Sequence, residues 1–342
     1  MTASRLTGPI RRHVRALLLG ALAAGLLGTG PAAAAEKELT FAHQDMVVPL
    51  RLLMADGEIE KATGYKINWR KFGGGGDVVR AMASGNVQMG EAGSSAIATA
   101  ASQGLDIQLV WILDDIADAE QLVARTGSGV KTIADLKGRT VAVPFVSTSH
   151  YQLIAALAEA GLTQKDVKIL NMRPPEIAAA WERGDIDATF VWDPVLARIK
   201  PTGTVITSAG EISKKGHATF DGIVVSREWA AANKPFLVQF VKMLAAKDAE
   251  YKAKAAAWGP ASPEAKAIGK ISGSAPEDVP ASLAAYRFLT LEEQASAAWL
   301  GGTAAKALAA TAAFLKEQGR VQAVAPDYAP FVTKDYVEAA TR

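Results

Sequence analysis

The chain has 342 residues, 49% of them apolar, 21% charged and 7% aromatic, which is the composition of a globular protein large enough to build more than one core. It contains no cysteine, which excludes disulfide scaffolds, thiolate metal sites, cysteine nucleophiles and a lipid-modified cysteine anchor. Only four histidines are present, which disfavours a histidine-rich metal centre.

The first 35 residues have the pattern of a secretory signal peptide. Four arginines precede an apolar run, Ala16–Leu27, which leads to the small-residue segment Pro31–Ala35. The run is shorter than the roughly 20 residues that span a bilayer. We therefore expect cleavage near Ala35 and release into an exported compartment. The pair Arg11-Arg12 leaves the general secretory and twin-arginine routes both open.

Removal of this segment changes the charge balance of the chain. It carries four of the 37 basic residues and none of the 35 acidic ones, so 33 basic and 35 acidic residues remain. No basic patch is left that would favour nucleic acid as a partner. An exported, cysteine-free and nearly neutral chain is typical of a soluble periplasmic protein of a Gram-negative bacterium.

After residue 36, short β-rich apolar runs alternate with helical stretches, which is typical of an α/β protein with largely parallel sheets. The expected strands are 39–43, 66–72, 87–91, 107–113, 121–125, 140–145, 167–171, 188–192 and 219–225. Helices are expected between them, including 149–160 and a helix that Pro174-Pro175 opens and Gly184 closes. Alanine-rich helices follow at 235–258, 263–271, 276–286, 291–299 and 304–318, and we expect them to pack on the first lobe.

One internal similarity indicates two related lobes. Residues 81–94 and 180–193, offset by 99 residues, both read as a helix end, a glycine, a strand and a polar loop. Ser94 and Asp193 then hold equivalent strand-end positions, where open α/β sheets bind ligands; a chance match of a common unit is the alternative. The predicted division is lobe 1 at 36–127 plus 220–342 and lobe 2 at 128–219, with crossings near 126–130 and 216–221.

Several strings, in order along the chain, resemble the substrate-binding proteins of ABC importers for sulfonates, specifically the taurine-binding proteins. They are Asn68–Phe72, Val79–Gly85, Gly93–Ser95, Val143–Tyr151, Pro174–Asp187, Val191-Trp192 and Phe314–Gly319. The resemblance implies a type II periplasmic-binding-protein-like α/β fold, with two lobes and a ligand cleft between them. It also implies a monomer without a cofactor, an ABC permease of the inner membrane as partner, and taurine (2-aminoethanesulfonate) as ligand. Another small sulfonate or zwitterion remains the alternative ligand.

A taurine site needs hydrogen-bond donors for the sulfonate. Ser147, Thr148 and Ser149 lie between a predicted strand and a predicted helix, and Ser94-Ser95 has the same placement in lobe 1. Backbone N–H groups and hydroxyls at a helix N terminus favour an anion. We expect one hydroxyl of each group to cap its helix and the others to contact the sulfonate.

The ammonium needs a carboxylate or an aromatic face. The resemblance favours Asp221 and Glu120, and position past a strand end adds Asp193 and Asp45. A solvated loop is the alternative for each. Trp192, and less so Trp111, could wall the ligand and contact its cation, although a strand tryptophan is often simply core. Asp114-Asp115 is interpreted as a polar strand exit.

Two other patterns point away from catalysis. The glycine run Gly73–Gly76 lacks the Gly-Lys-Ser/Thr ending of a phosphate loop, so we interpret it as a loop at the cleft rim. An exported enzyme on the same fold remains the alternative function. The chain has neither a Gly-x-Ser-x-Gly elbow nor histidines at metal-ligand spacing, so no catalytic residue is assigned.

Overall fold

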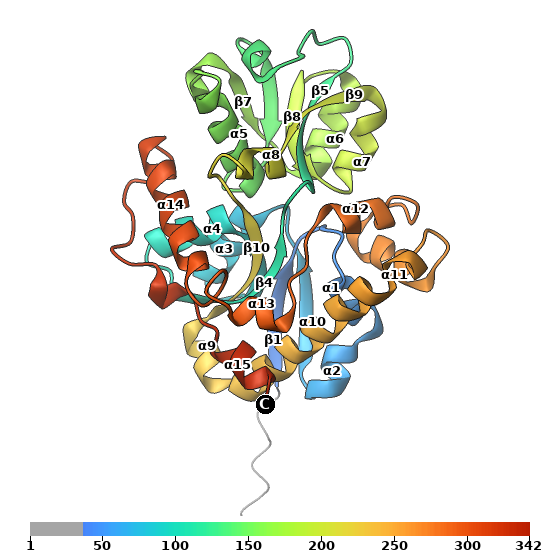
Figure 1. The fold of residues 1–342 in the computed structure, drawn as a ribbon, viewed down its shortest axis with the longest axis vertical. Coiled ribbons are helices and arrows are strands. Elements are labelled where there is room, and N and C mark those ends of the chain that lie inside the picture. Colours follow the sequence, from blue (N-terminus) through green and yellow to red (C-terminus); the bar gives the residue numbers. More distant parts are fainter. Residues whose placement is uncertain (1–36) are drawn as a thin grey trace, which may run out of the picture. The chain divides into compact units, whose positions relative to one another are not determined.

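The computed structural model describes residues 37–342, so the predicted signal peptide lies outside the described residues. Two α/β lobes each contain a five-stranded sheet (Figure 1). In sheet order, the first lobe has β2 (Lys66–Lys71), β1 (Glu38–His43), β3 (Met89–Gly93), β10 (Phe220–Ser226) and β4 (Ile107–Asp115). The second has β7 (Lys168–Asn171), β6 (Thr140–Val143), β8 (Ala188–Trp192), β5 (Glu120–Arg125) and β9 (Gly203–Ser208).

Both sheets are mixed, but in each of them four of the five strands run in the same direction, so the expectation of largely parallel sheets is confirmed. In the first, β1 runs parallel to β2 and β3, whereas β10 runs antiparallel to β3 and β4. In the second, β6 runs parallel to β7 and β8, whereas β5 runs antiparallel to β8 and β9. The reversed strands, β5 and β10, are those that follow a crossing from the other lobe rather than a βαβ connection.

The repeated unit of the sequence corresponds to a repeated unit of structure. Strands β3 and β8 are 99 residues apart and occupy the central position of their sheets. The helices before them, α3 (Gly75–Ala83) and α6 (Pro174–Arg183), also end close to this offset. Gly184 ends α6 with φ of 78°, a left-handed conformation that favours glycine.

The chain leaves the first lobe earlier than expected. Strand β5 pairs with β8 and β9, so the outgoing crossing is residues 116–119 rather than 126–130, and β5 belongs to the second lobe. The returning crossing, residues 214–219, agrees with the sequence. The two crossings are hydrogen-bonded where the Ile116 amide donates to the Thr219 carbonyl at 3.4 Å.

Helices surround both sheets and most of the C-terminal ones pack on the first lobe. Helix α10 contacts α1, α2 and α15, α11 contacts α1, and α14 contacts α4. The helices are α1 (Leu50–Asp56), α2 (Glu58–Thr63), α3, α4 (Ser94–Ser102), α5 (Thr148–Glu159), α6, α7 (Val195–Ile199), α8 (Ala209–Ser213), α9 (Arg227–Ala232), α10 (Lys234–Lys254), α11 (Pro263–Ser272), α12 (Val279–Ala285), α13 (Leu291–Ala295), α14 (Thr303–Glu317) and α15 (Asp335–Ala340). Among residues 37–342, none of these helices has the length and apolar character needed to cross a bilayer.

Candidate binding site

A small pocket lies where strand ends and helix starts of the two lobes meet. About 270 Å³ of space between the atoms belongs to it, part of which is open to solvent. Its lining is Gln44, Met46, Gly75, Gly93 and Asp221 from the first lobe, Glu120, Ser147, Thr148 and Trp192 from the second, and Tyr286 after α12. Both lobes therefore contribute to the lining.

Two buried carboxyl groups, Glu120 and Asp221, form one side of this pocket. They are 4% and 5% exposed, and within residues 37–342 neither forms an ion pair with a basic side chain. Burial raises the pKa of Glu120 to about 7, against the opposing hydrogen bond from Thr148. Burial and then the negative charges of Glu120 and Glu91 raise the pKa of Asp221 well above its usual value. Neither carboxyl group thus receives a positive charge from a basic side chain of residues 37–342, and a cationic ligand could supply it.

The hydroxyl groups at the start of α5 are divided between capping and the pocket. Ser147 caps the helix by accepting a hydrogen bond from the His150 amide at 3.1 Å, as expected. The Thr148 hydroxyl donates to Glu120 Oε1 at 2.6 Å. This bond connects a hydroxyl group predicted to contact the sulfonate with a carboxyl group predicted to contact the ammonium. Ser149 is fully buried, its Oγ has no hydrogen-bond partner among residues 37–342, and it does not line the pocket.

The second predicted hydroxyl group, Ser94-Ser95, lies beside the pocket rather than in its lining. The N-cap of α4 is Gly93, which has no hydroxyl, so the expectation that a serine caps this helix was wrong. Ser94 Oγ accepts a hydrogen bond from the Phe220 amide at 3.4 Å, and Ser95 Oγ is buried without a described partner. Gly93 itself lines the pocket, because a residue without a side chain lets Thr148 and Asp221 approach.

Trp192 lines the pocket and is held by Asp45. The indole Nε1 donates to Asp45 Oδ1 at 3.0 Å, and both side chains are buried. Asp45 comes from the first lobe and Trp192 from the second, so this bond joins them across the pocket. Burial raises the pKa of Asp45, which is not part of the lining. Trp111 is fully buried in β4 and also lies outside the lining.

Asp193 is directed away from the pocket. Its Oδ1 accepts from the Ala197 amide at 2.7 Å at the start of α7, and its Oδ2 accepts from the Ser282 hydroxyl at 2.5 Å. Successive residues of a strand point to opposite sides, so the inward Trp192 places Asp193 outward. Asp193, which the internal similarity made equivalent to Ser94, thus contacts α7 and α12 and does not line the pocket.

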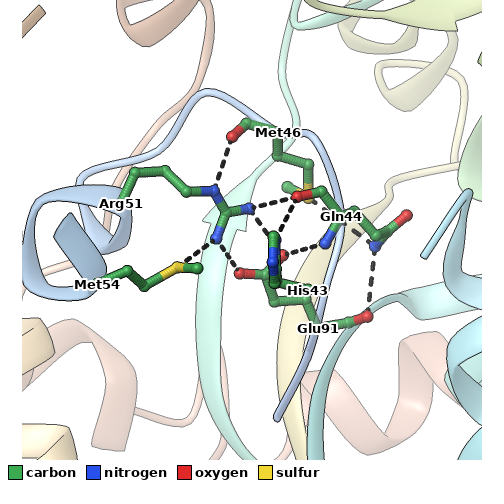
Figure 2. Close-up of polar contacts among 6 residues, drawn as sticks. All are labelled: His43, Gln44, Met46, Arg51, Met54 and Glu91. Atoms are coloured by element: carbon green, nitrogen blue, oxygen red, sulfur yellow. Dashed lines mark hydrogen bonds and ion pairs between the residues drawn. The ribbon is translucent and has the colours of Figure 1, made fainter. Parts of the chain in front are cut away.

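In the loop after β1 the sequence analysis identified Asp45 but not its neighbours Gln44 and Met46, which line the pocket. Figure 2 shows that Arg51 and Glu91 hold this loop. Arg51 is fully buried, pairs with Glu91 at 2.8 Å, and donates to the carbonyls of Met46 and Gln44 at 3.1 and 3.2 Å. The Gln44 amide donates to Glu91 at 3.0 Å. A charged residue inside the buried strand β3 is the one signal of this network in the sequence.

The glycine run lies where the lobes touch, near the pocket. A Cβ on Gly76 would stand 3.1 Å from the Phe145 carbonyl, and one on Gly73 would stand 2.7 Å from Arg173 Cδ. Asp77 and Arg173 form an ion pair at 3.0 Å across the same boundary. Gly75 lines the pocket, and Gly75 and Gly76 begin α3 rather than extending a loop.

Comparisons with known proteins agree with this architecture. The model of the NMT1/THI5-like family matches residues 61–252. The taurine-binding periplasmic protein of Escherichia coli (strain K12) is 38% identical over 303 residues, which cover 88% of this chain and 92% of that protein. Within residues 37–342, no cluster of side chains has the composition of a metal site.

Solved structures with the same fold include binding proteins and one enzyme. The alkanesulfonate-binding protein SsuA of Xanthomonas axonopodis pv. citri, bound to MOPS, has a TM-score of 0.69 at 24% identity, covering 90% of this chain and 99% of that one. The desulfurization enzyme DSZB has a TM-score of 0.59 at 13% identity, covering 89% and 99%. At these identities the likeness shows the fold alone, the two-lobed fold of periplasmic binding proteins.

Proposed function

This chain belongs to the NMT1/THI5-like family, and we propose that it is a periplasmic binding protein that captures taurine and delivers it to an ABC importer. The observation that carries the proposal is the pair of buried carboxyl groups, Glu120 and Asp221, in a pocket without a basic ion-pair partner among residues 37–342. The E. coli relative, whose name gives taurine as its ligand, supports the same reading.

The ammonium of taurine supplies the charge that the carboxyl side lacks. A buried carboxylate is costly unless a cation or donors compensate it. Glu120 Oε2 has no hydrogen-bond partner among residues 37–342, so it is available to an N–H donor. Asp221 enters the same pocket from β10, and Trp192 offers an aromatic face beside them. We assign Glu120 and Asp221 to the ammonium and Trp192 to the ligand wall.

The sulfonate is assigned to the N terminus of α5. This helix has 12 residues and begins at Thr148 in the pocket lining, so its first amides and its dipole favour an anion there. Gly75 and Gly93, which present backbone to the pocket, complete this side.

Calorimetry and thermal unfolding test the proposal directly. We expect a Kd near micromolar, about −8 kcal/mol, and roughly 2.7 kcal/mol of stabilisation at 100-fold excess of taurine over Kd. Sulfate and acetate at matched ionic strength are the controls, and they should give no shift in Tm. Absence of a shift with millimolar taurine would exclude taurine, and a larger shift with a carboxylate zwitterion would reassign the ligand.

The alternative is an enzyme, because the desulfurization enzyme has the same fold. The relative with 38% identity is named as a binding protein, which favours capture over chemistry. Mass spectrometry of taurine incubated with the protein separates the two: a binding protein returns it unchanged. Loss of taurine or formation of sulfite would support the enzyme.

Export, subunit state and partner complete the proposal. We expect a mature chain that begins just after Ala35, is a monomer, and docks on an inner-membrane permease. Intact-mass measurement of the protein from the periplasmic fraction tests the cleavage, and light scattering tests the monomer. Stimulation of ATP hydrolysis by the reconstituted importer, only when taurine is present, tests the docking.

A further inference from the structure

Asp114 is a buried acid that the pocket lining does not explain. It is the penultimate residue of β4 and lies directly across from Asp221 of β10. It is fully buried, and neither of its carboxyl oxygens accepts a hydrogen bond from an N–H or hydroxyl donor among residues 37–342. Directly opposed side chains on antiparallel strands stand about 5 Å apart at Cβ, so the two carboxyl groups share a small volume. The interpretation of Asp114 as a polar strand exit was therefore wrong.

The two arginines that pair with acids adjoining this site, Arg51 and Arg287, are engaged by those acids. Glu91 on β3, whose charge acts on Asp221, is neutralised by Arg51 at 2.8 Å. Asp115, next to Asp114 on β4, lies 3.7 Å from Arg287. Neither arginine forms an ion pair with the pocket acids in the part of the chain that the structure describes.

The remaining groups around Asp114 and Asp221 add no positive charge. Glu120 faces them from β5 and is itself acidic. Tyr286 stays neutral, because burial and the charges of Asp114 and Asp221 raise its pKa well above its usual value. Burial first, and then the charge of Asp221, raises the pKa of Asp114 well above its usual value. Three acids therefore share a region in which water is scarce and no protein cation compensates them.

Taurine brings one ammonium to these three acids. One positive charge cannot compensate three neighbouring carboxylates. Glu120 and Asp221 line the pocket and can contact the ammonium, whereas Asp114 does not line it. The charge count therefore leaves Asp114 as the acid that keeps a proton.

We propose that Asp114 is a positioning residue that stays protonated in the free and taurine-bound protein and donates a hydrogen bond to Asp221. This bond opposes the rise in the Asp221 pKa that burial causes, so it favours the ionised form of Asp221 and turns it toward the ammonium. Arrival of the ammonium then ionises Glu120, whose proton passes to the buffer, and no other bond changes. The inference rests on the proposed function for the identity of the ligand, and its first claim, a protonated Asp114, concerns the free protein.

Titration calorimetry of the full mature chain tests the proton release. Binding heats are compared at pH 6 in two buffers of different ionisation enthalpy. Because Glu120 has a pKa of about 7 in the free protein, it is mainly protonated at pH 6, and we expect about one proton released per taurine. The Kd should rise about tenfold per pH unit as the pH falls below 7. Equal heats in both buffers would overturn the release.

Two substitutions distinguish a neutral Asp114 from a charged one. Asp114→Asn keeps a neutral donor and should retain near wild-type affinity and the same proton release. Asp114→Leu removes the donor and should weaken taurine binding at least about tenfold. Asp221 also becomes easier to protonate in this variant, so its affinity should stay low up to a higher pH than that of the wild type. Asp115→Asn on the same strand is the matched control. An Asp114→Asn variant as weak as Asp221→Asn would show that Asp114 carries charge in the complex.

Infrared spectroscopy tests the first claim without taurine. A protonated carboxyl group has a carbonyl band that a carboxylate lacks. Buried Asp248 on α10, whose pKa burial also raises, contributes to the same band, so the readout is the part of the band that depends on Asp114. At pH 8 we expect the band of the free protein to be retained in Asp115→Asn and to lose the intensity of one carboxyl group in Asp114→Asn. An unchanged band in Asp114→Asn would overturn the inference even if taurine binds. A band that decreases in Asp114→Asn, in a protein that does not bind taurine, would instead leave Asp114 protonated and refute the proposed ligand.

Discussion

Asp221 is the residue on which the assignment of the ammonium depends most. Asp221→Asn removes one carboxylate from the pocket, and breaking a buried charge pair costs roughly 3–5 kcal/mol. We expect taurine binding to fall by at least a hundredfold, whereas ethanesulfonate, which has no amine, should lose much less. Calorimetry with both ligands measures the difference. Exposed Asp106, which pairs with Arg227, gives the control variant Asp106→Asn; equal losses for both ligands would make Asp221 structural.

Thr148 connects the two ends of the site. Its hydroxyl donates to Glu120 at 2.6 Å, and this bond lowers the pKa that burial raises. Thr148→Val should therefore raise the Glu120 pKa further, protonate more of it at pH 7, and weaken taurine by about 1–3 kcal/mol.

The pH dependence separates this mechanism from loss of a sulfonate contact. Affinity of Thr148→Val should recover toward the wild type at pH 9, where Glu120 is ionised in both proteins. The control is Thr204→Val on β9, at an exposed position of the second lobe. A deficit that persists unchanged at pH 9 would show that the hydroxyl serves the anion directly.

At the scale of single residues, the sequence predicted which acids line the pocket better than it predicted which other residues surround them. Glu120, Asp221, Trp192, Ser147 and Thr148 all line the pocket. Asp193 does not, because its carboxyl group accepts hydrogen bonds from the Ala197 amide and the Ser282 hydroxyl, and the distant Ser282 contact cannot be predicted from a local pattern. Tyr286 comes from a distant turn after α12, which no local pattern connects to the strands.

Close approach of β3 and α5 depends on Gly93. A Cβ at this position would stand 2.7 Å from Thr148 Cγ2 and 3.2 Å from Asp221 Oδ1. Gly93→Ala should therefore hold the two elements apart and weaken taurine by about 1–3 kcal/mol, the usual cost of overpacking. Gly259→Ala is the control, because no atom lies within 4 Å of its added carbon. Normal affinity in Gly93→Ala would mean that binding does not need this approach.

At the scale of elements, local patterns predicted most strands but not their pairing. The offset of 99 residues correctly related β3 to β8, because both strands are buried and each follows a helix that ends near a glycine. The place of β5 was not predictable from its short separation from β4, since only pairing with β8 and β9 decides its sheet. Strand β9 was missed altogether, because only one of its six residues is buried and its hydrophobic pattern is weak.

The stability of the whole molecule should decrease from mildly acidic to neutral pH when no ligand is present. Glu120 has a pKa of about 7 in the fold against 4.5 as the ordinary value, so the folded state binds more protons than the unfolded state in this range. By linkage, the stabilisation that comes from the raised Glu120 pKa is fully present below the pKa of the unfolded state and is lost as the pH rises through the pKa of the folded state. The free energy of unfolding should fall by a few kcal/mol in order of magnitude, at about 1.4 kcal/mol per pKa unit.

Differential scanning calorimetry between pH 4.5 and 8 measures this slope. Glu120→Gln should flatten it, because the amide has no proton to lose, and saturating taurine should offset it by supplying a cation to the ionised site. The control Glu228→Gln lies on α9, outside the pocket lining. A Tm that rises across this range in the ligand-free wild type, and equally in Glu120→Gln, would contradict a buried neutral Glu120.

The two crossings between the lobes end at the acids assigned to the ammonium. The outgoing one ends next to Glu120 and the returning one ends two residues before Asp221, and the crossings are hydrogen-bonded to each other. If the lobes rotate about these segments, as two-lobed receptors do, atoms near the pivot move least and those far along the lever arms move most. The two carboxyl groups then keep their separation in an opened protein, which retains its cation subsite while the rest of the ligand contacts disperse. Capture therefore begins with the amine as an anchor at the pivot, and the lobes close afterwards on the rest of the molecule.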